Sequence, residues 1–422
     1  MRRSQLTGRC IQLAVACALG LSADLAVASP PAWQPDVAYT AGTVVLFNGH
    51  DFSALVAQTD FSGTGWNPTI ASLWKDLGAD GGGTPPPPPP GPPPPPPPGP
   101  PPPPPPPGPP PPPPPTGGIP FSPYKDITVG MDWNTNIMGS AVTGTAQPLL
   151  KVMPTNLSTL IWSFATGECG SENWAGVTPA QLVGANVQNF ISNGKAYIIG
   201  TGGANGAFTC GSDAGFTKFI NTYMSPNMVG VDFDIEGGQS PTDVVNLVNR
   251  VKAAEQTFPN LRFSFTLATF GGTAQPNLNS LGDSVMQAIK AAGLTKYTIN
   301  LMVMDYGSAT PNNCVVVNGA CQMGQSAIQA AMMQHSFYGT PFNQIELTPL
   351  IGGNDTIGET FTLQDVTTVD NFVKQNGLAG VHFWSFDRDC DSPPGASSDV
   401  CNSYGQAGRL GFSTKFLSDL GH

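Results

Sequence analysis

The sequence has 422 residues, which is long enough for two or three domains, and 46 of them are proline. Its net charge of −11 argues against nucleic acid or an anionic membrane as a partner, because both are bound by clustered lysine and arginine. An uncharged polymer fits the acidic balance equally well. The composition therefore excludes partners without identifying one.

Residues 1–28 have the pattern of an export signal. A basic region at Arg2, Arg3 and Arg9 precedes a largely apolar segment, residues 10–21, and small residues end the signal at Ala28. The apolar segment is too short to span a bilayer, so a membrane anchor is the less favoured alternative. We expect cleavage after Ala28 and a secreted, extracellular protein.

Residues 31–80 predict a small all-β module. Two short β-type runs, residues 43–47 and 51–57, are joined by Asn48 and Gly49, and Asn-Gly between such runs is a strong hairpin signal. A piece of this size buries little core. It is too small for an elaborate active site, so we interpret it as a binding module.

Residues 81–118 form a Pro/Gly-rich linker, in which proline runs are broken by single glycines. Proline cannot donate ladder or helix hydrogen bonds, so this segment is expected to be a semi-rigid polyproline II spacer. At ~3.1 Å per residue its reach is on the order of 100 Å. A ligand for SH3-type domains is the alternative, which an exported chain disfavours.

Strand-like and helix-like stretches then alternate through residues 119–422. Eight βα units in a segment of this length predict an α/β fold, a (β/α)8 TIM barrel. An open doubly wound sheet is the alternative, but no glycine-rich phosphate loop follows the first strand. The predicted strands are residues 127–132, 159–165, 196–200, 230–236, 262–269, 298–306, 345–351 and 380–386. The apolar-periodic helices include residues 241–257, 281–292 and 326–335.

Six cysteines remain once the signal is removed, and an even number in an exported protein suggests disulfides. Six cysteines allow 15 pairings. Chain proximity favours Cys314–Cys321 and Cys390–Cys401, which leaves Cys169–Cys210. The spacing matches no zinc pattern, so we expect no metal site.

The segment with the clearest chemistry is residues 231–236, Val-Asp-Phe-Asp-Ile-Glu. Strand side chains alternate between faces, so Asp232, Asp234 and Glu236 share one face. In a barrel the apolar set faces the helices and the acids point inward. Three acids roughly 6.5–7 Å apart in a protected interior cannot all ionise at ordinary cost. Perturbed acids at the end of a barrel strand predict a catalytic site, while a solvated strand face or a calcium site is the alternative.

This segment resembles the D-x-x-D-x-D-x-E signature of glycoside hydrolase family 18, the chitinase family. Asp232, Asp234 and Glu236 match its last three acids, and Val229 stands in place of the first. The replaced position is the one farthest from the chemistry.

Other segments are similar to the same family in the same order along the chain. Residues 201–203, Thr-Gly-Gly, resemble the Ser-x-Gly-Gly of strand three. Residues 300–306 resemble the strand-six N-x-M-x-Y-D-Y, with Met304 in the usual tyrosine position. Residues 348–352 resemble a strand-seven segment, and Trp384 stands where the family places the tryptophan under the catalytic subsite. A buried core tryptophan is the alternative for Trp384.

The resemblance implies a retaining, substrate-assisted glycosidase without the usual nucleophilic carboxylate. Glu236 is then the general acid and later the base, and the N-acetyl oxygen of the sugar attacks the anomeric carbon. Asp234 orients the acetamide and stabilises its developing charge, and Asp232 shares a proton with Asp234. No metal or organic cofactor is needed.

The same resemblance implies a set of substrate contacts. Trp384 lies under the sugar, and Asp305 and Met304 face it from strand six. Because Met304 replaces the tyrosine that holds the acetamide oxygen, Tyr306 is the nearest substitute.

The N-terminal module is similar to the chitin-binding modules of carbohydrate-binding families 5 and 12. The matching stretches are residues 32–33, 39–44 and 73–75. Flat exposed aromatics bind crystalline polysaccharide by stacking on sugar faces. The family often carries paired tryptophans where residues 56–57 stand here, so Trp33, Trp66 and Phe52 are the candidates for the binding face. Trp74 is as well explained as a core residue.

The predicted protein is a secreted, monomeric chitinase whose partner is chitin or a related N-acetylglucosamine polysaccharide. Residues 352–379, between strands seven and eight, leave no room for an inserted wall domain. The barrel also carries few tryptophans, so we expect an open groove and endo-action. A non-catalytic chitin-binding lectin and an endo-β-N-acetylglucosaminidase are the alternatives.

Overall fold

The computed structural model describes residues 29–35, 37–55, 58–59, 67–70, 73–79, 119–392 and 398–422. The chain divides into two compact units, residues 1–105 and 106–422. The predicted export signal, the linker and Trp66 lie outside the described residues.

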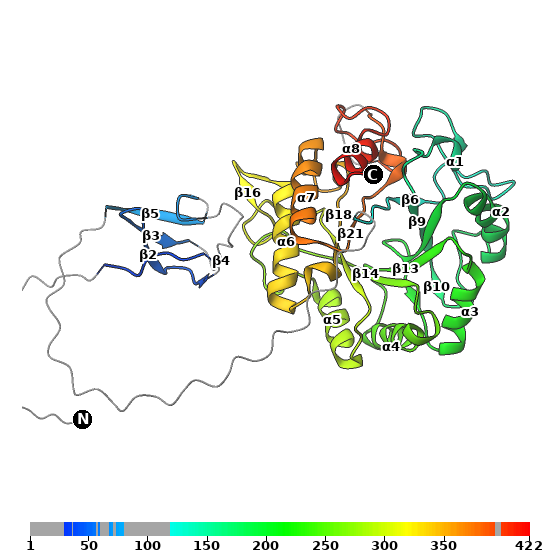
Figure 1. Ribbon diagram of the computed structural model, residues 1–422, viewed down its shortest axis with the longest axis horizontal. Helices are drawn as coiled ribbons and strands as arrows, with labels where there is room; N and C mark the ends of the chain where they lie inside the picture. Colours follow the sequence, from blue (N-terminus) through cyan, green and yellow to red (C-terminus); the bar gives the residue numbers. More distant parts are fainter. Residues whose placement is uncertain are drawn as a thin grey trace, which may run out of the picture. The chain divides into compact units, whose positions relative to one another are not determined.

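The first unit contains a three-stranded antiparallel sheet in the order β2-β3-β5, and a short antiparallel pair of β1 with β4 (Figure 1). The predicted hairpin is present. Phe47 pairs with His50, and Asn48 and Gly49 between them have φ values of 50° and 82°, as a tight hairpin turn requires. The strands are β1 (Ala38–Tyr39), β2 (Val44–Phe47), β3 (His50–Ala54), β4 (Gln58–Thr59) and β5 (Trp74–Ala79).

The core of this unit is small and aromatic. Tyr39 and Trp74 are buried with their ring centroids 5.1 Å apart, and Phe52 is buried beside them. Trp33 is partly buried and packs edge-on against Phe47, with 5.2 Å between the ring centroids. One side of Trp33 therefore supports the fold while the rest of the ring reaches the surface.

The second unit is an eight-stranded parallel barrel, as predicted, with helices around the outside (Figure 1). Its strand order is β21-β18-β15-β14-β13-β11-β9-β6. Backbone hydrogen bonds close the ring between the last strand and the first, because Ser122 N donates to Val381 O and Val381 N donates to Pro120 O (3.3 and 2.9 Å). The strands are β6 (Tyr124–Asp126), β9 (Thr159–Ala165), β11 (Ala196–Gly202), β13 (Met228–Ile235), β14 (Arg262–Ala268), β15 (Thr298–Met302), β18 (Ile345–Thr348) and β21 (Gly380–Val381).

The helices alternate with these strands and begin at recognisable caps. Ser240 caps the helix after β13 in a reciprocal box with Asp243, and Pro241 occupies its first position. The helices are α1 (Leu149–Val152), α2 (Pro179–Ser192), α3 (Asp213–Tyr223), α4 (Pro241–Thr257), α5 (Ser280–Ala292), α6 (Met323–Tyr338), α7 (Leu363–Asn376) and α8 (Gly411–Leu420). Short pairs lie in the loops: β7 (Gly139–Ser140) with β8 (Gln147–Pro148), β10 (Gly167–Glu168) with β12 (Phe208–Thr209), β16 (Val316–Val317) with β17 (Ala320–Cys321), and β19 (Gly352–Gly353) with β20 (Thr360–Phe361).

The predicted position of the first strand was wrong. The strand lies at Tyr124–Asp126 rather than at residues 127–132, because the Asp126 carboxylate accepts hydrogen bonds from the backbone N–H and the hydroxyl of Thr128 (2.8 and 2.7 Å). Such a local turn competes with strand pairing. Strand six also ends at Met302, before the predicted residue 306, and Asp305 beyond it has a φ of 48°.

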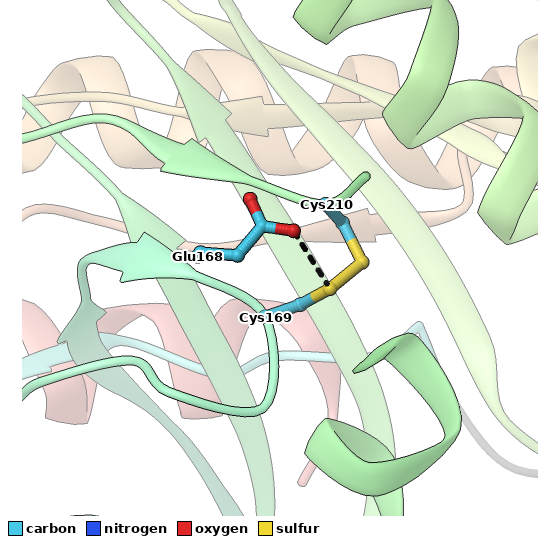
Figure 2. Close-up of side chains that lie close together, drawn as sticks. All are labelled: Glu168, Cys169 and Cys210. Atoms are coloured by element: carbon cyan, nitrogen blue, oxygen red, sulfur yellow. Dashed lines mark hydrogen bonds between the residues drawn. A yellow bond between two sulfur atoms is a disulfide. The ribbon is translucent and has the colours of Figure 1, made fainter. Parts of the chain in front are cut away.

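The three predicted disulfides are present: Cys169–Cys210, Cys314–Cys321 and Cys390–Cys401. The first joins the β10 and β12 segments (Figure 2), and the second closes the hairpin of β16 and β17. Each holds a loop outside the barrel sheet.

Among the helices of the described residues, none combines the length and the apolar character needed to cross a membrane.

Candidate active site

A cavity of about 460 Å³ opens at the carboxyl ends of the barrel strands. All eight strands, or the residues directly after them, contribute to its wall, which is the usual arrangement of a catalytic face in this fold. Its acidic lining residues are Asp126, Asp234, Glu236, Asp305, Asp355 and Asp399, and its aromatic ones are Tyr124, Phe164 and Trp384.

The acids of β13 point inward as the alternation predicts. Asp232 is 0% exposed and Asp234 is buried at the cavity wall, while Glu236, one residue after the strand, is partly exposed. The opposite face of β13 carries Phe233, which packs on Phe216 of α3 with 6.1 Å between the ring centroids. The three acids are therefore graded in depth, from the barrel interior to its mouth.

Asp232 is held by hydroxyl groups from neighbouring strands. Ser264 pairs with it in register on β14 and donates to its Oδ1, as does Thr266 (2.7 Å), while Tyr124 of β6 donates to Oδ2 (2.8 Å). Burial raises the pKa of Asp232, and these three hydrogen bonds oppose the increase. The hydroxyls thus replace the water that a buried carboxyl has lost.

Asp234 has no comparable support. Its Oδ1 is buried and has no hydrogen-bond partner among the described residues. Burial, with the charges of Glu236 and Asp232, raises the pKa of Asp234 well above its usual value. Asp234 also lines the cavity, so its carboxyl lies within reach of a polar group of a bound molecule.

Glu236 stands at the mouth of the cavity. Burial raises its pKa, the backbone N–H of Ala204 opposes this by donating a hydrogen bond, and the charge of Asp305 raises it further. A raised pKa favours the protonated form of a carboxyl, which is the form that acts as a general acid.

The glycine that ends β11 and the glycine after it allow this arrangement. Gly202 has a φ of 85°, and a Cβ there would lie 2.0 Å from the carbonyl oxygen of Asp234. Gly203 donates from its N–H to the same oxygen (3.2 Å), and a Cβ there would meet the ring of Phe164. Both positions need glycine because backbone and ring approach too closely for a side chain.

The three residues predicted to contact substrate from strand six do not all lie at the cavity. Met304 and Asp305 line the cavity, but Tyr306 does not: it is 3% exposed, with its hydroxyl buried and unpartnered among the described residues. The left-handed backbone at Asp305 redirects the chain, so the alternation of side chains no longer holds there. This placement does not fit the substrate contact predicted for Tyr306.

Trp384 lies at the cavity as predicted, with its indole stacked on Phe164 at 5.5 Å between ring centroids and an interplanar angle of 8°. The ring centroid of Tyr124 lies 6.0 Å from that of Trp384. The sequence reasoning did not single out Tyr124 or Phe164, although each lies in a predicted barrel strand or just before one.

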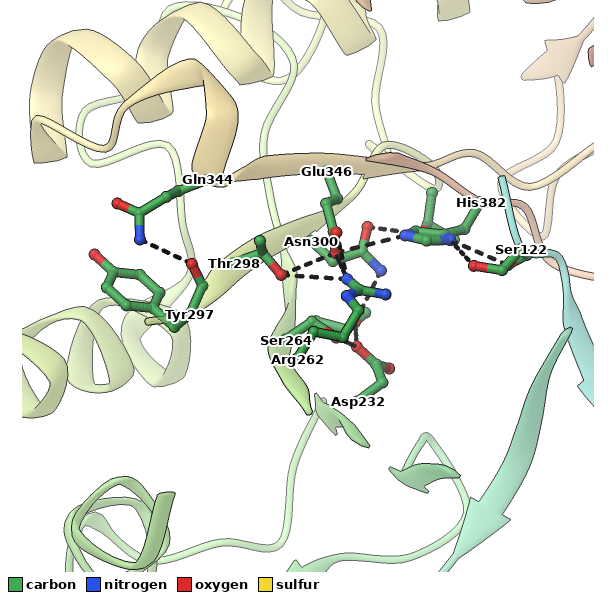
Figure 3. A network of polar contacts seen from close by, with 12 residues as sticks. Ser122, Asp232, Arg262, Ser264, Tyr297, Thr298, Asn300, Gln344, Glu346 and His382 are labelled. Carbon is green, nitrogen blue, oxygen red and sulfur yellow. Dashed lines mark hydrogen bonds and ion pairs between the residues drawn. The ribbon is translucent and has the colours of Figure 1, made fainter. Parts of the chain in front are cut away.

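A second polar cluster joins the first residue of β14, the second residue of β18 and the residue after β21 (Figure 3). Arg262 and His382 both pair with the buried carboxylate of Glu346. Burial alone would raise the pKa of Glu346, but Arg262 and His382 outweigh it and lower the pKa to about 2. This cluster links β14 and β18 to the residue that follows β21.

The predicted binding residues of the N-terminal unit differ in exposure. Trp33 is partly exposed, but Phe52 is 8% exposed and belongs to the core, which does not fit the predicted sugar contact. Trp74 is buried. Trp66 lies outside the described residues.

Glu168, Cys169 and Cys210 lie close enough together to suggest a metal site (Figure 2). The two sulfur atoms are bonded to each other and so cannot act as thiolate ligands. Glu168 instead accepts hydrogen bonds from the Thr209 hydroxyl and the Gly211 N–H, each at 2.6 Å. The cluster fixes the loop between β10 and β12.

Comparison with known proteins supports both resemblances. Residues 32–75 match the model of carbohydrate-binding module family 5/12. Endochitinase 11 of Metarhizium anisopliae is 26% identical over 217 residues, covering 46% of this chain and 40% of its own. A probable bifunctional chitinase/lysozyme of Escherichia coli strain K12 is 28% identical over 220 residues, covering 46% of this chain and 23% of its own. The chain thus matches less than half the length of these relatives.

Among solved structures, active domain 2 of a chitinase from Pyrococcus furiosus has a TM-score of 0.56. It is 23% identical, and the match covers 72% of this chain and 97% of that domain. This similarity confirms the TIM-barrel fold.

Proposed function

We propose that this protein is a secreted chitinase that hydrolyses β-1,4-N-acetylglucosamine linkages. The observation that carries the proposal is the position of Glu236 and Asp234 at one cavity wall, in a chain similar to chitinases. The N-terminal match to a carbohydrate-binding module supports a polysaccharide substrate.

In the proposed reaction, protonated Glu236 donates its proton to the glycosidic oxygen as the bond to the anomeric carbon breaks. The acetamide oxygen of the same sugar attacks that carbon, so retention follows without a carboxylate nucleophile. Asp234, which lines the cavity, accepts a hydrogen bond from the acetamide N–H and stabilises the positive charge of the cyclic intermediate. Glu236, now ionised, then removes a proton from the attacking water.

The substrate contacts proposed for the cavity are mainly apolar on one side. Trp384, stacked on Phe164, offers a flat face for a sugar ring. Met304 lines the cavity where the family motif has a tyrosine. Tyr124 is the tyrosine among the described lining residues, and its hydroxyl already donates to Asp232. We therefore assign the orientation of the acetamide chiefly to Asp234.

The proposed mode of attack is endo and weakly processive. Between β18 and β21 the chain forms the hairpin of β19 and β20 and then α7, with no inserted domain among these described residues. Two of the barrel tryptophans, Trp162 and Trp174, are buried in the core, and Trp133 is 54% exposed outside the cavity lining. An open groove without a row of aromatics lets a chain enter anywhere and leave after a cut.

The test is the substitution Glu236→Gln, which preserves shape and removes the transferable proton. We expect turnover of colloidal chitin to fall by ~10²–10⁴-fold while binding to chitin is retained. Glu255→Gln on the outer helix α4 is the matched control and should leave turnover unchanged. Activity of Glu236→Gln within a factor of a few of wild type would overturn the assignment. A wild-type protein that binds chitin without turnover, or that prefers a glycoprotein, would indicate a lectin or an endo-β-N-acetylglucosaminidase instead.

A further inference from the structure

The loop between β19 and β20 holds the segment that carries Asp305. Asn354 accepts a hydrogen bond at Oδ1 from Asp305 N (3.2 Å), and the N–H of Thr356 donates to Asp305 Oδ1 (2.9 Å). Glu359, at the other end of the loop, accepts at Oε2 from Tyr306 N (3.0 Å). The loop therefore contacts both the backbone and the carboxylate of the cavity segment.

The loop is also closed on itself. Asn354 N donates to Glu359 O (3.0 Å), and the side-chain amide of Asn354 donates to Leu350 O (2.9 Å) and Gly352 O (3.2 Å). Asn354 is thereby hydrogen-bonded to the segment that follows β18, and Glu359 is hydrogen-bonded to Asn354. Movement of one end of the loop would be transmitted to the other.

Glu359 is an unusual residue for this place. It is 4% exposed, its Oε1 has no hydrogen-bond partner among the described residues, and it does not line the cavity. A buried carboxyl that is only partly hydrogen-bonded is costly. The reaction proposed above does not use this carboxyl.

We propose that Glu359 is a positioning residue, which holds Asp305 in its left-handed conformation at the cavity wall beside Glu236. The proposal rests on the proposed function, because Asp305 matters only if Glu236 is the acid. Asp305 is the link: it lines the cavity with Glu236, and its charge acts on that group.

The protonation state of Glu359 sets the charge that lies near Asp305. Burial, with the neighbouring charge of Asp305, raises the pKa of Glu359 to about 7. The charge of Asp365 raises the pKa of Tyr306, and the charge of Asp355 raises the pKa of Asp305. The positive group acting on Asp305 is Arg388, whose guanidinium also donates to the carbonyl oxygens of residues 351 and 353. Loss of the proton thus adds a negative charge to a mostly acidic surrounding.

The experiment measures the pH dependence of kcat and kcat/KM on a soluble chromogenic chitin oligosaccharide, for wild type, Glu359→Gln and Glu359→Ala. Glutamine keeps an acceptor oxygen for Tyr306 N but cannot ionise. We expect Glu359→Gln to keep kcat within about threefold at pH 5 and to lose the part of the alkaline decline that sets in near pH 7. Glu359→Ala removes the acceptor, and kcat should fall at least tenfold at all pH values with a smaller change in KM.

The matched control is Asp370→Asn in α7, a buried acid whose pKa burial likewise raises, to about 8, but which does not line the cavity. Its activity profile should superimpose on wild type. A Glu359→Gln profile identical to wild type would overturn the proposal, even if Glu359→Ala fails to fold. An inactive wild type would refute the proposed function alone. Binding of a chitin oligosaccharide, followed by tryptophan fluorescence, then replaces kcat/KM as the readout of the same pH dependence.

Discussion

Substitution of Gly202 by alanine tests whether the close approach of the end of β11 to β13 positions the acids. The new Cβ would lie 2.0 Å from the carbonyl oxygen of Asp234, whereas packed atoms need at least 3.0 Å, so the two backbones must separate by about 1 Å. The φ of 85° adds a penalty of roughly 1–2 kcal/mol for a residue with a Cβ. With ~1–3 kcal/mol for the overlap, the total loss is about 2–5 kcal/mol.

This loss should lower Tm by about 3–8 °C for a barrel of about 300 residues. In the folded fraction, a shift of about 1 Å at Asp234 should reduce kcat on a soluble chitin oligosaccharide by ~10²-fold. Calorimetry and initial rates check the two effects separately. Gly184→Ala in α2 is the control, because nothing lies within 4 Å of its Cβ, and helix propensity should stabilise it by ~0.5–1 kcal/mol. A Gly202→Ala variant with wild-type Tm, and kcat within threefold of wild type, would refute the reasoning.

Three other outcomes are expected. Deletion of residues 31–80 should lower activity on insoluble chitin far more than on short soluble oligosaccharides, because the module acts by raising local concentration; equal losses would show that it supports the fold or the site. Asp370→Asn should raise Tm at pH 8 but not at pH 4. Burial raises the pKa of Asp370 to about 8. Because this carboxyl holds its proton more tightly in the folded state, the free energy of unfolding of the wild type falls as the pH rises from 4 to 8, by at most ~1.4 kcal/mol per pH unit. Equal Tm differences between variant and wild type at both pH values would contradict this. Viscosity of a soluble chitin derivative should fall steeply before many reducing ends appear, and a slow fall with disaccharide as the main early product would argue against endo-action.

Local sequence determined several features of this protein. The alternation of acids along residues 232–236 needs no tertiary information, because successive side chains of any strand point to opposite faces. The helix Pro241–Thr257 was predicted from its apolar periodicity with the bounds that the structure has, and its cap at Ser240 is likewise a local feature. The two disulfides of short separation follow from chain proximity, and the third by elimination.

Turns and burial decided where the predictions failed. The first strand ends at Asp126 because a side-chain turn forms there, and Tyr306 leaves the cavity because Asp305 adopts a left-handed backbone. The strand pattern alone does not say which face of the sheet Phe52 is on. Its packing in one buried cluster with Trp74 places it in the core. Each outcome depends on contacts between segments that a local pattern does not contain.

The surroundings of the acids belong to the tertiary structure alone. Tyr124 reaches Asp232 across 108 residues of sequence, and Glu359 reaches Tyr306 across 53. Barrel closure and strand register create these contacts, because they decide which inward-facing side chains become neighbours. The sequence by itself therefore determined which groups are candidates for the chemistry, and the fold decided which neighbours surround each of them.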